Sequence, residues 1–232
     1  MGYMRKAIQE YGMIEPGDRI AVGISGGKDS IALAAGLAGL QKFIGIPFQL
    51  VGVTLDPGWN GQRTDYGPIG QMCESMGMAY HVLETEIGPI VFEAREESNP
   101  CSLCARMRRG ALHDAAKQFG CNKIALGHHY DDAVETFVMN LFHEGRVGCF
   151  SPVTYLSRKD LTMIRPLIFA PEREIASAVR KAGYPIIKSQ CPVDGSTQRE
   201  WTKNWLRQME KEQKGITKRL FGAMKRGHIS DW

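Results

Sequence analysis

The residues best suited to chemistry near the start of the chain form a short loop, Ser25-Gly26-Gly27-Lys28-Asp29-Ser30. It follows an apolar run at residues 19–24 and leads directly into another at residues 31–35, so the expected order is strand, loop, helix. Paired glycines let the backbone approach a ligand closely, and the helix start presents free N–H groups and a positive dipole end. With the ammonium group of Lys28, these features predict a site for phosphate groups. The alternative is a tight turn before a helix capped by Ser25 or Ser30.

The spacing of this loop differs from that of two common nucleotide-binding motifs. A Walker A loop needs Gly-Lys-Ser/Thr after four intervening residues, and a dinucleotide-binding loop needs more widely spaced glycines. The hexapeptide resembles instead the Ser-Gly-Gly-x-Asp-Ser loop of the PP-loop ATPases. This resemblance implies that the six residues bind the phosphates of ATP, that Lys28 and Asp29 take part in catalysis, and that a carbonyl-type oxygen is adenylated with release of pyrophosphate.

A second polar segment follows the strand expected at residues 122–127. It reads His128-His129-Tyr130-Asp131-Asp132-Ala133-Val134-Glu135-Thr136. If a helix begins near Asp131, then Asp131 and Glu135 share one face and Asp132 lies on the next. We expect these carboxylates and Gly127 to form a second wall of the ATP site, with Mg²⁺ held between carboxylates and phosphates. The alternative is a helix start whose acidic residues only complement the helix dipole.

Asp56 lies at the carboxyl end of another expected strand, residues 48–55. Ligands of open α/β sheets bind at this edge, so Asp56 is a candidate contact for the nucleotide or its metal ion. Asp56 also precedes Pro57, and a turn-forming Asp before proline is an equally good interpretation.

Three of the six cysteines fit a metal centre. Cys101 and Cys104 lie three residues apart at the start of a helix expected to reach about residue 119, so their thiols converge. The helix dipole and nearby arginines should favour their thiolate forms. They could hold zinc, form a redox disulfide or bind an iron–sulfur cluster, although the second Cys-x-x-Cys that is usual in a closed zinc site is absent from the sequence. Cys191 is the remaining candidate, and three thiolates suit a cluster with one open iron.

Several stretches resemble the tRNA 2-thiocytidine synthetase family of PP-loop enzymes. They are residues 101–110, residues 123–129, the run Ile164-Arg165-Pro166-Leu167, and Cys191. The His-His-x-Asp-Asp-x-x-Glu-Thr block resembles one that this family shares with the tRNA lysidine synthetases. The resemblance implies ATP and Mg²⁺ as cofactors, a 4Fe-4S cluster on the three cysteines, and replacement of a cytidine oxygen in the tRNA anticodon loop by sulfur. It implies catalytic roles for Asp131 and the three cysteines, a nucleotide contact at Asp132, and a sulfur donor such as a cysteine desulfurase.

Alternating strand and helix patterns predict an α/β fold with an open, mostly parallel, doubly wound sheet and a helical C-terminal extension. The expected strands cover residues 19–24, 48–55, 79–83 and 122–127. Residues 1–195 should form the nucleotide-binding and catalytic domain that carries the cysteines. Residues 196–232 should form the basic helical extension.

The positive charge of the chain is concentrated in this tail. From Arg199 onward there are nine Lys or Arg and four Asp or Glu, whereas the whole chain carries a net charge of +4. Basic residues recur every fourth position from Arg199 to Lys211, with Lys214 and Lys218 continuing the stripe; Trp201, Trp205 and Met209 recur at the same interval. On one helix the tryptophans would pack on the enzyme body, and the basic stripe would face outward to bind RNA phosphates. A plain solvated face is the alternative. The predicted RNA-binding residues are Arg106, Arg108, Arg109, Lys203, Arg207 and Lys211.

The composition, with 43% apolar residues, is that of a globular protein, and no stretch is apolar for long enough to cross a bilayer. We therefore expect a cytoplasmic protein without structural disulfides. Cys73 and Cys121 should be buried as small apolar residues, and Cys149 has no assignment. Whether the chain forms a homodimer is left open.

Other functions remain compatible with these motifs. A lysidine-type enzyme would join an amine to the activated base, but it gives no role to three converging cysteines. An ATP-dependent amide ligase could carry a structural zinc or iron–sulfur site. A third alternative is an ATP-dependent RNA-binding module without catalytic activity.

Overall fold

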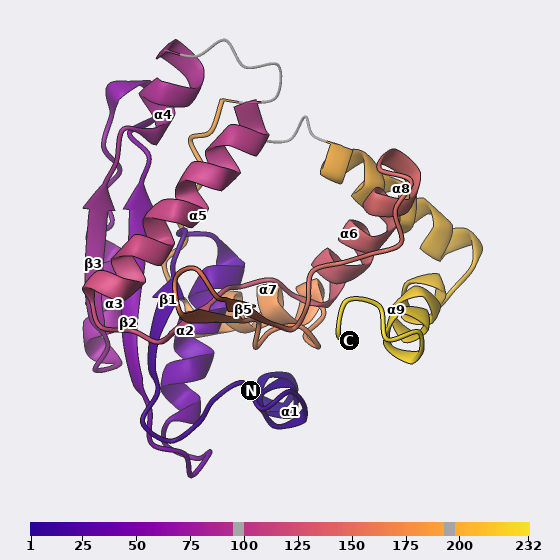
Figure 1. Ribbon diagram of the computed structural model, residues 1–232, viewed down its shortest axis with the longest axis horizontal. Coiled ribbons are helices and arrows are strands. Elements are labelled where there is room, and N and C mark those ends of the chain that lie inside the picture. Colours follow the sequence, from indigo (N-terminus) through magenta and orange to yellow (C-terminus); the bar gives the residue numbers. More distant parts are fainter. Residues whose placement is uncertain (95–99, 193–197) are drawn as a thin grey trace.

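The computed structural model describes residues 1–94, 100–192 and 198–232. In these residues the strands form one six-stranded sheet of order β3-β2-β1-β4-β6-β5 (Figure 1). The strands are β1 (Arg19–Gly23), β2 (Gln49–Asp56), β3 (Ala79–Glu84), β4 (Lys123–Ala125), β5 (Val153–Leu156) and β6 (Leu161–Ile164). All neighbouring pairs are parallel except β5 and β6, which are antiparallel. The predicted open, mostly parallel sheet is confirmed.

Helices follow most of the strands. They are α1 (Gly2–Glu10), α2 (Lys28–Leu40), α3 (Gly67–Ser75), α4 (Ile87–Pro89), α5 (Pro100–Gln118), α6 (Tyr130–His143), α7 (Glu172–Ala182), α8 (Gln198–Glu212) and α9 (Ile216–Arg226). A 3₁₀ turn, η1 (Trp59–Gly61), and a π-helical turn, η2 (Ile90–Ala94), lie between β2 and α5. None of the described helices is both long and apolar enough to span a bilayer.

Both faces of the sheet are covered, because the central strand β1 is apolar on both sides. Ile20, Ala21 and Val22 are all fully buried. Successive residues of a strand point to opposite faces. Accordingly, Val22 packs in a large apolar cluster with residues of α2, α6 and α7, whereas Ala21 packs in a second cluster with residues of α5, such as Ala115. The arrangement places the carboxyl end of β1 between α5 on one side and α6 on the other.

The C-terminal helices extend the large cluster. Helices α8 and α9 pack against α6, and Leu206, Phe221 and Trp232 are buried in the same cluster as the sheet. An ion pair between Lys225 and Glu10 joins α9 to α1. The expected boundary between residues 195 and 196 lies outside the described residues, so the division into two domains stays a prediction.

The expected single tail helix is wrong, because the helix is interrupted at Gly215, which has φ +83° and separates α8 from α9. The predicted packing of the tryptophans is confirmed in part. Trp205 packs against the large cluster and against Phe142 of α6, whereas Trp201 also contacts Phe142 but is 51% exposed. The buried residues of α8 are Thr202 and Leu206. A period of four residues fixes which residues share a face, but it does not determine which of those faces packs against the protein.

Candidate functional site

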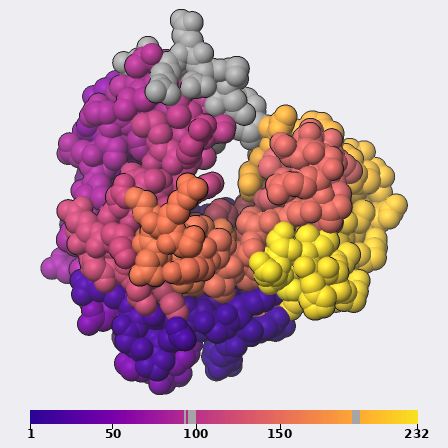
Figure 2. Space-filling view, viewed as in Figure 1, coloured from indigo at the N-terminus to yellow at the C-terminus, as the bar shows by residue number. Residues whose placement is uncertain are grey.

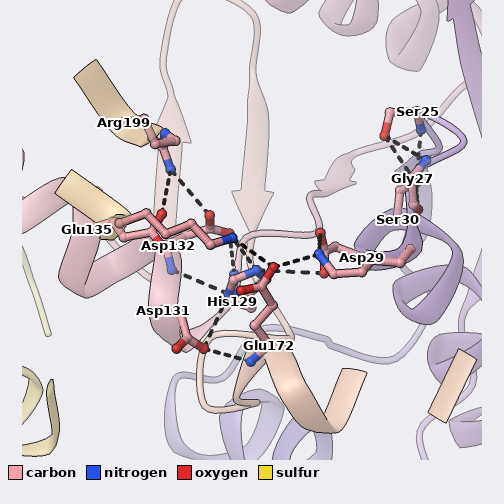
Figure 3. A network of polar contacts seen from close by, with 12 residues as sticks. Ser25, Gly27, Asp29, Ser30, His129, Asp131, Asp132, Glu135, Glu172 and Arg199 are labelled. Atoms are coloured by element: carbon pink, nitrogen blue, oxygen red, sulfur yellow. Dashed lines mark hydrogen bonds and ion pairs between the residues drawn. The ribbon is translucent and has the colours of Figure 1, made fainter. Parts of the chain in front are cut away.

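Ser30 fixes the shape of the predicted phosphate loop. Its Oγ atom accepts a hydrogen bond from the backbone N–H of Ser25 (3.1 Å) and donates one to the carbonyl oxygen of Gly27 (2.9 Å), as Figure 3 shows. Gly26 has φ +88°, a conformation that strains residues with a side chain. Among the described residues, no side chain caps the start of α2 at Gly27, so the first N–H groups of that helix remain available to a ligand. This geometry favours a phosphate site over a capped turn.

Two backbone contacts pack other segments against the loop. A Cβ atom on Gly127, just beyond β4, would stand 3.1 Å from the carbonyl carbon of Asp29, which leaves no room for a larger residue. On the other side, the backbone N–H of Ile187 donates to the carbonyl oxygen of Gly26 (3.0 Å). Ile187 lies four residues before Cys191, so one chain segment joins the loop to the third predicted thiol.

A cleft of about 410 Å³ opens beside the loop, at the carboxyl ends of β1, β2 and β4. Figure 2 shows a hollow between the side of the molecule that carries α5 and the side that carries α6 and α8. Five predicted nucleotide-site residues line the cleft: Ser25, Asp29, Ser30, Gly127 and Asp132. Apolar residues of the strand ends and of α5 supply much of the remaining wall, namely Ile24, Val53, Leu55, Leu112, Leu126 and Met163. An apolar wall next to a phosphate loop suits a nucleotide, whose base is flat and apolar on its faces.

Lys28 does not line this cleft, although it belongs to the loop. Its ammonium group lies 3.0 Å from Oδ2 of Asp29 and 3.0 Å from Oε1 of Glu172, at the start of α7. The same Oε1 atom lies 2.9 Å from the ammonium group of Lys203 on α8. Burial alone would raise the pKa of Glu172, but the hydrogen bonds from Lys203 and Lys28 lower it to about 2. Glu172 is therefore ionised at neutral pH and holds two lysines, a role for which the sequence offers no motif.

The two aspartates at the start of α6 have different surroundings. Asp132 lines the cleft, accepts a hydrogen bond from the backbone N–H of His129 (3.0 Å), and pairs with Arg199 of α8 (3.2 Å). Asp131 instead accepts a hydrogen bond from the backbone N–H of Glu172 (2.6 Å) and does not line the cleft. The structure thus places Asp132 at the cleft beside the loop, and it gives Asp131, predicted to be catalytic, a contact that holds the start of α7.

His129 completes the polar network of Figure 3. Its ring Nδ1 accepts from the backbone N–H of Asp132 (3.3 Å), and its Nε2 lies 3.7 Å from Oδ1 of Asp29. That Oδ1 atom is buried without a hydrogen-bond partner in the described chain, although Asp29 lines the cleft. Two carboxylates, Asp29 and Asp132, therefore line the cleft, and carboxylate oxygens are ligands that suit Mg²⁺.

The pKa values of two titratable side chains near this network, His128 and Glu135, are shifted. Burial, reinforced by the positive charge of Arg165, lowers the pKa of His128 to about 4, so this wall of the cleft carries a neutral imidazole at physiological pH. Burial, reinforced by the charge of Asp132, raises the pKa of Glu135 to about 7.

Asp56 does not serve the predicted nucleotide contact. Its two carboxylate oxygens accept backbone hydrogen bonds from Gly58 (3.1 Å) and Thr64 (3.1 Å), and the side chain is buried away from the cleft. The geometry supports the turn-forming alternative.

The three predicted cluster ligands gather at the start of α5. Cys104 is buried in a small apolar cluster with Trp59 and Leu103, and Cys191 packs against the same cluster. Cys101 is exposed at the first turn of the helix. Burial raises the pKa of Cys104, Arg108 opposes the rise, and the charges of Cys191 and Cys101 add to it, so Cys104 lies within electrostatic reach of both other thiols. Arg108 thus acts in the predicted direction, but burial outweighs it, and the pKa of Cys104 is raised.

The number and type of ligands bear on which metal the thiols could hold. Within the described residues, no group of three or more His, Cys, Asp or Glu side chains is arranged to hold a metal ion. Three free thiols are one ligand short of a closed structural zinc site, and thiolates are the usual ligands of a 4Fe-4S cluster. The three thiols therefore suit an iron–sulfur centre. Cys73 and Cys121 are buried, as predicted, and Cys149 donates its thiol hydrogen to the carbonyl oxygen of Ala133.

Helix α5 joins the thiols to the nucleotide cleft. Ala105, Arg108 and Arg109, which follow Cys104 within two turns, all line the cleft, while Arg106 is exposed and does not. Two arginines assigned by sequence to RNA therefore face the same space as the loop.

The predicted basic stripe on α8 is divided between two roles. Arg199 and Lys203 turn inward to Asp132 and Glu172. Arg207 and Lys211 are exposed and, with Lys203, supply the basic residues of a second cavity of about 400 Å³ between α6, α7, α8 and α9. Its acidic residues are Asp131, Glu135, Glu172 and Glu210.

Comparisons with known proteins agree with these features. The model of the PP-loop domain family matches residues 3–211. The tRNA-cytidine(32) 2-sulfurtransferase of Geobacter sulfurreducens is 40% identical over 222 residues, which cover 94% of this chain and 86% of the relative. A protein of the same name from Pelobacter propionicus is 40% identical over 226 residues, covering 96% of this chain and 83% of the relative.

Among solved structures, the U34-tRNA thiolase NcsA from Methanococcus maripaludis, determined with its 4Fe-4S cluster, superimposes with a TM-score of 0.81. It is 26% identical, and the match covers 97% of this chain and 77% of the thiolase. The chain therefore belongs to the PP-loop family and, within it, to the tRNA-cytidine 2-sulfurtransferases.

Proposed function

We propose that the protein is an ATP-dependent sulfurtransferase that adenylates the base oxygen of a cytidine in tRNA and replaces it with sulfur. One observation carries this proposal: α5 begins with Cys101 and Cys104, and its next two turns line the cleft beside the phosphate loop. An adenylating site and a sulfur-delivering site would have to share one such space, because the activated base must meet sulfur before water reaches it. The names of the relatives specify the cytidine at tRNA position 32.

In the first step, ATP lies on the loop, with the N–H groups at the start of α2 and the ammonium group of Lys28 around its phosphates. The cytidine oxygen attacks the α-phosphorus, the bond to the β-phosphate breaks, and pyrophosphate leaves. Asp29 and Asp132 would hold Mg²⁺, which neutralises the charge that develops on the phosphates. Arg108 and Arg109 face the same space from α5.

In the second step, sulfur forms a bond to the ring carbon, the bond between that carbon and the adenylated oxygen breaks, and AMP leaves with the oxygen. Cys101, Cys104 and Cys191 would hold a 4Fe-4S cluster, which supplies the sulfur when bound. The donor system we propose is a cysteine desulfurase with a thiol reductant, because the desulfurase produces persulfide sulfur and two thiols, oxidised to a disulfide, reduce it to the sulfide that bonds to the ring carbon. The lysidine-type alternative leaves the three thiols without a role.

The decisive experiment is a mass analysis of tRNA nucleosides. Deleting the gene should remove 2-thiocytidine, and the wild-type gene should restore it. Purified protein reconstituted without oxygen should form 2-thiocytidine in unmodified tRNA from ATP and sulfide, with one AMP per thiolated base. Unchanged 2-thiocytidine in the deletion strain, or AMP formation without thiolation, would refute the proposal.

The exposed part of the basic stripe, Arg207 and Lys211 on α8 and Lys214 just beyond its end, should bind the tRNA backbone. Changing Arg207, Lys211 and Lys214 together to Glu is expected to weaken tRNA binding and to flatten its dependence on salt, by about one unit of slope for each phosphate that is no longer neutralised. Filter binding at several salt concentrations measures both quantities. Lys203 is left in place, because it pairs with Glu172.

The matched control changes three exposed basic residues elsewhere, Lys42, Arg158 and Lys181, to Glu, which alters the net charge equally. If the control weakens binding as much as the α8 variant, only total charge matters and the helix has no specific part in RNA binding.

A further inference from the structure

The carboxylate of Glu172 joins the phosphate loop to the tail helix. A single oxygen, Oε1, lies 3.0 Å from the ammonium group of Lys28 on α2 and 2.9 Å from that of Lys203 on α8. All three side chains are partly shielded from water, with 30%, 24% and 23% of the side chain exposed for Lys28, Glu172 and Lys203. Ion pairs shielded in this way are screened less by salt than pairs at the surface.

Glu172 is itself held firmly. It is the first residue of α7, after Pro171, and its backbone N–H donates to Oδ2 of Asp131 (2.6 Å). The backbone of Glu172 is therefore fixed in place, and the two long lysine side chains reach its carboxylate from different helices. Changing only its charge should leave this backbone contact in place.

The position of Lys28 conflicts with its expected task. The lysine of a phosphate loop has to reach the phosphates, yet this one does not line the cleft and already has two carboxylate partners, Asp29 and Glu172. When the negatively charged phosphates of ATP arrive, they must compete with Glu172 for the same ammonium group. Lys203 remains as a second cation that can neutralise Glu172 once Lys28 has left.

We propose that Glu172 is a positioning residue for the nucleotide step. Its carboxylate pairs with the ammonium group of Lys28 beside the loop until ATP binds, and the phosphates of ATP then replace Glu172 as the partner of Lys28. The inference rests on the proposed function, because it takes ATP as the ligand of the loop. Lys203 makes this change of partner possible. Without Lys203, the carboxylate of Glu172 would be left half-buried and without a cation when Lys28 moves to the phosphates, and a shielded charge without a partner costs free energy.

Glu172→Gln tests the proposal, because it removes the charge and keeps the shape. The affinity for Mg²⁺ and a non-hydrolysable ATP analogue, measured by calorimetry, is expected to rise three- to tenfold, since the phosphates no longer compete with a carboxylate. In turnover, the KM for ATP should fall while kcat does not rise. A residue that merely supports the fold would instead lose affinity when replaced.

Two further variants keep the test sharp. Glu174 lies on the same helix and pairs with its neighbour Arg173 (3.9 Å), so the analogue affinity of Glu174→Gln should stay within twofold of wild type. Lys203→Gln should change the affinity in the opposite direction and weaken analogue binding several-fold. Without Lys203, the carboxylate of Glu172 would pair with Lys28 alone and hold it more strongly. Thermal unfolding of each variant shows whether it is folded.

Unchanged or weaker analogue binding in folded Glu172→Gln, or equal tightening in Glu174→Gln, would overturn the inference. If wild-type protein thiolates tRNA but Glu172→Gln does not bind the analogue more tightly, the inference fails and the proposed function stands. If the tightening occurs but no 2-thiocytidine is formed by wild type, the proposed function fails and the role of Glu172 stands.

Discussion

Lys28→Ala is expected to lower kcat/KM for ATP-dependent thiolation roughly a hundred- to a thousandfold, the usual effect of removing one charged or polar contact to a developing negative charge. The ammonium group is the only mobile cation that the loop itself provides, and its neighbours Gly26 and Gly27 offer only backbone N–H groups. Release of pyrophosphate in the presence of tRNA is the measurement, because it reports adenylation before sulfur is involved.

The fold of this variant should be retained. Removing Lys28 leaves Glu172 paired with Lys203, and Asp29, which loses its ammonium partner, has a side chain that is 30% exposed and can be hydrated. Lys42→Ala, an exposed lysine just beyond the end of α2, is the matched control and should behave like wild type. Pyrophosphate release close to the wild-type rate in Lys28→Ala would remove the loop lysine from the reaction.

The second large effect is expected from the thiols. Changing Cys101, Cys104 or Cys191 singly to Ala should abolish the iron–sulfur absorption band of anaerobically purified protein and stop thiolation. Each single substitution would remove one of the three protein ligands, and we expect the two remaining thiolates not to retain the cluster. Visible absorption, iron content and nucleoside analysis check the result in parallel.

Binding of an ATP analogue separates the two centres in these variants. It should persist when a thiol is removed, because the loop is built by Ser30 and Gly127 and not by the cysteines. Cys73→Ala and Cys121→Ala serve as controls, since both residues are buried in apolar clusters and should keep the absorption band. Colourless wild-type protein with one zinc per chain would contradict the iron–sulfur assignment.

The phosphate loop and the sheet could be predicted because their signals are local. The run from Arg19 to Ser30 encodes a buried strand, a glycine turn and a helix start within a dozen residues, and the structure reproduces that order. Cys101 and Cys104 could also be identified from spacing alone, since a helix start places such a pair together.

The parts that sequence reasoning missed depend on contacts between distant segments. Glu172 meets Lys28 only because α7 and α2 pack side by side, and no motif surrounds it. Asp56 is equally suited by sequence to a ligand and to a turn, and only the folded chain shows that the backbone N–H groups of Gly58 and Thr64 use both of its oxygens. On α8, Arg199 and Lys203 were expected to face solvent, but acidic groups on α6 and α7 draw them inward.

The hydrogen bond from Ile187 to the carbonyl oxygen of Gly26 also couples the third thiol to the phosphate loop. Cys191 follows Ile187 by four residues, so a displacement of the loop backbone would be passed along this short segment to the thiol. The nucleotide site and the third cysteine therefore share one backbone connection in addition to the cleft.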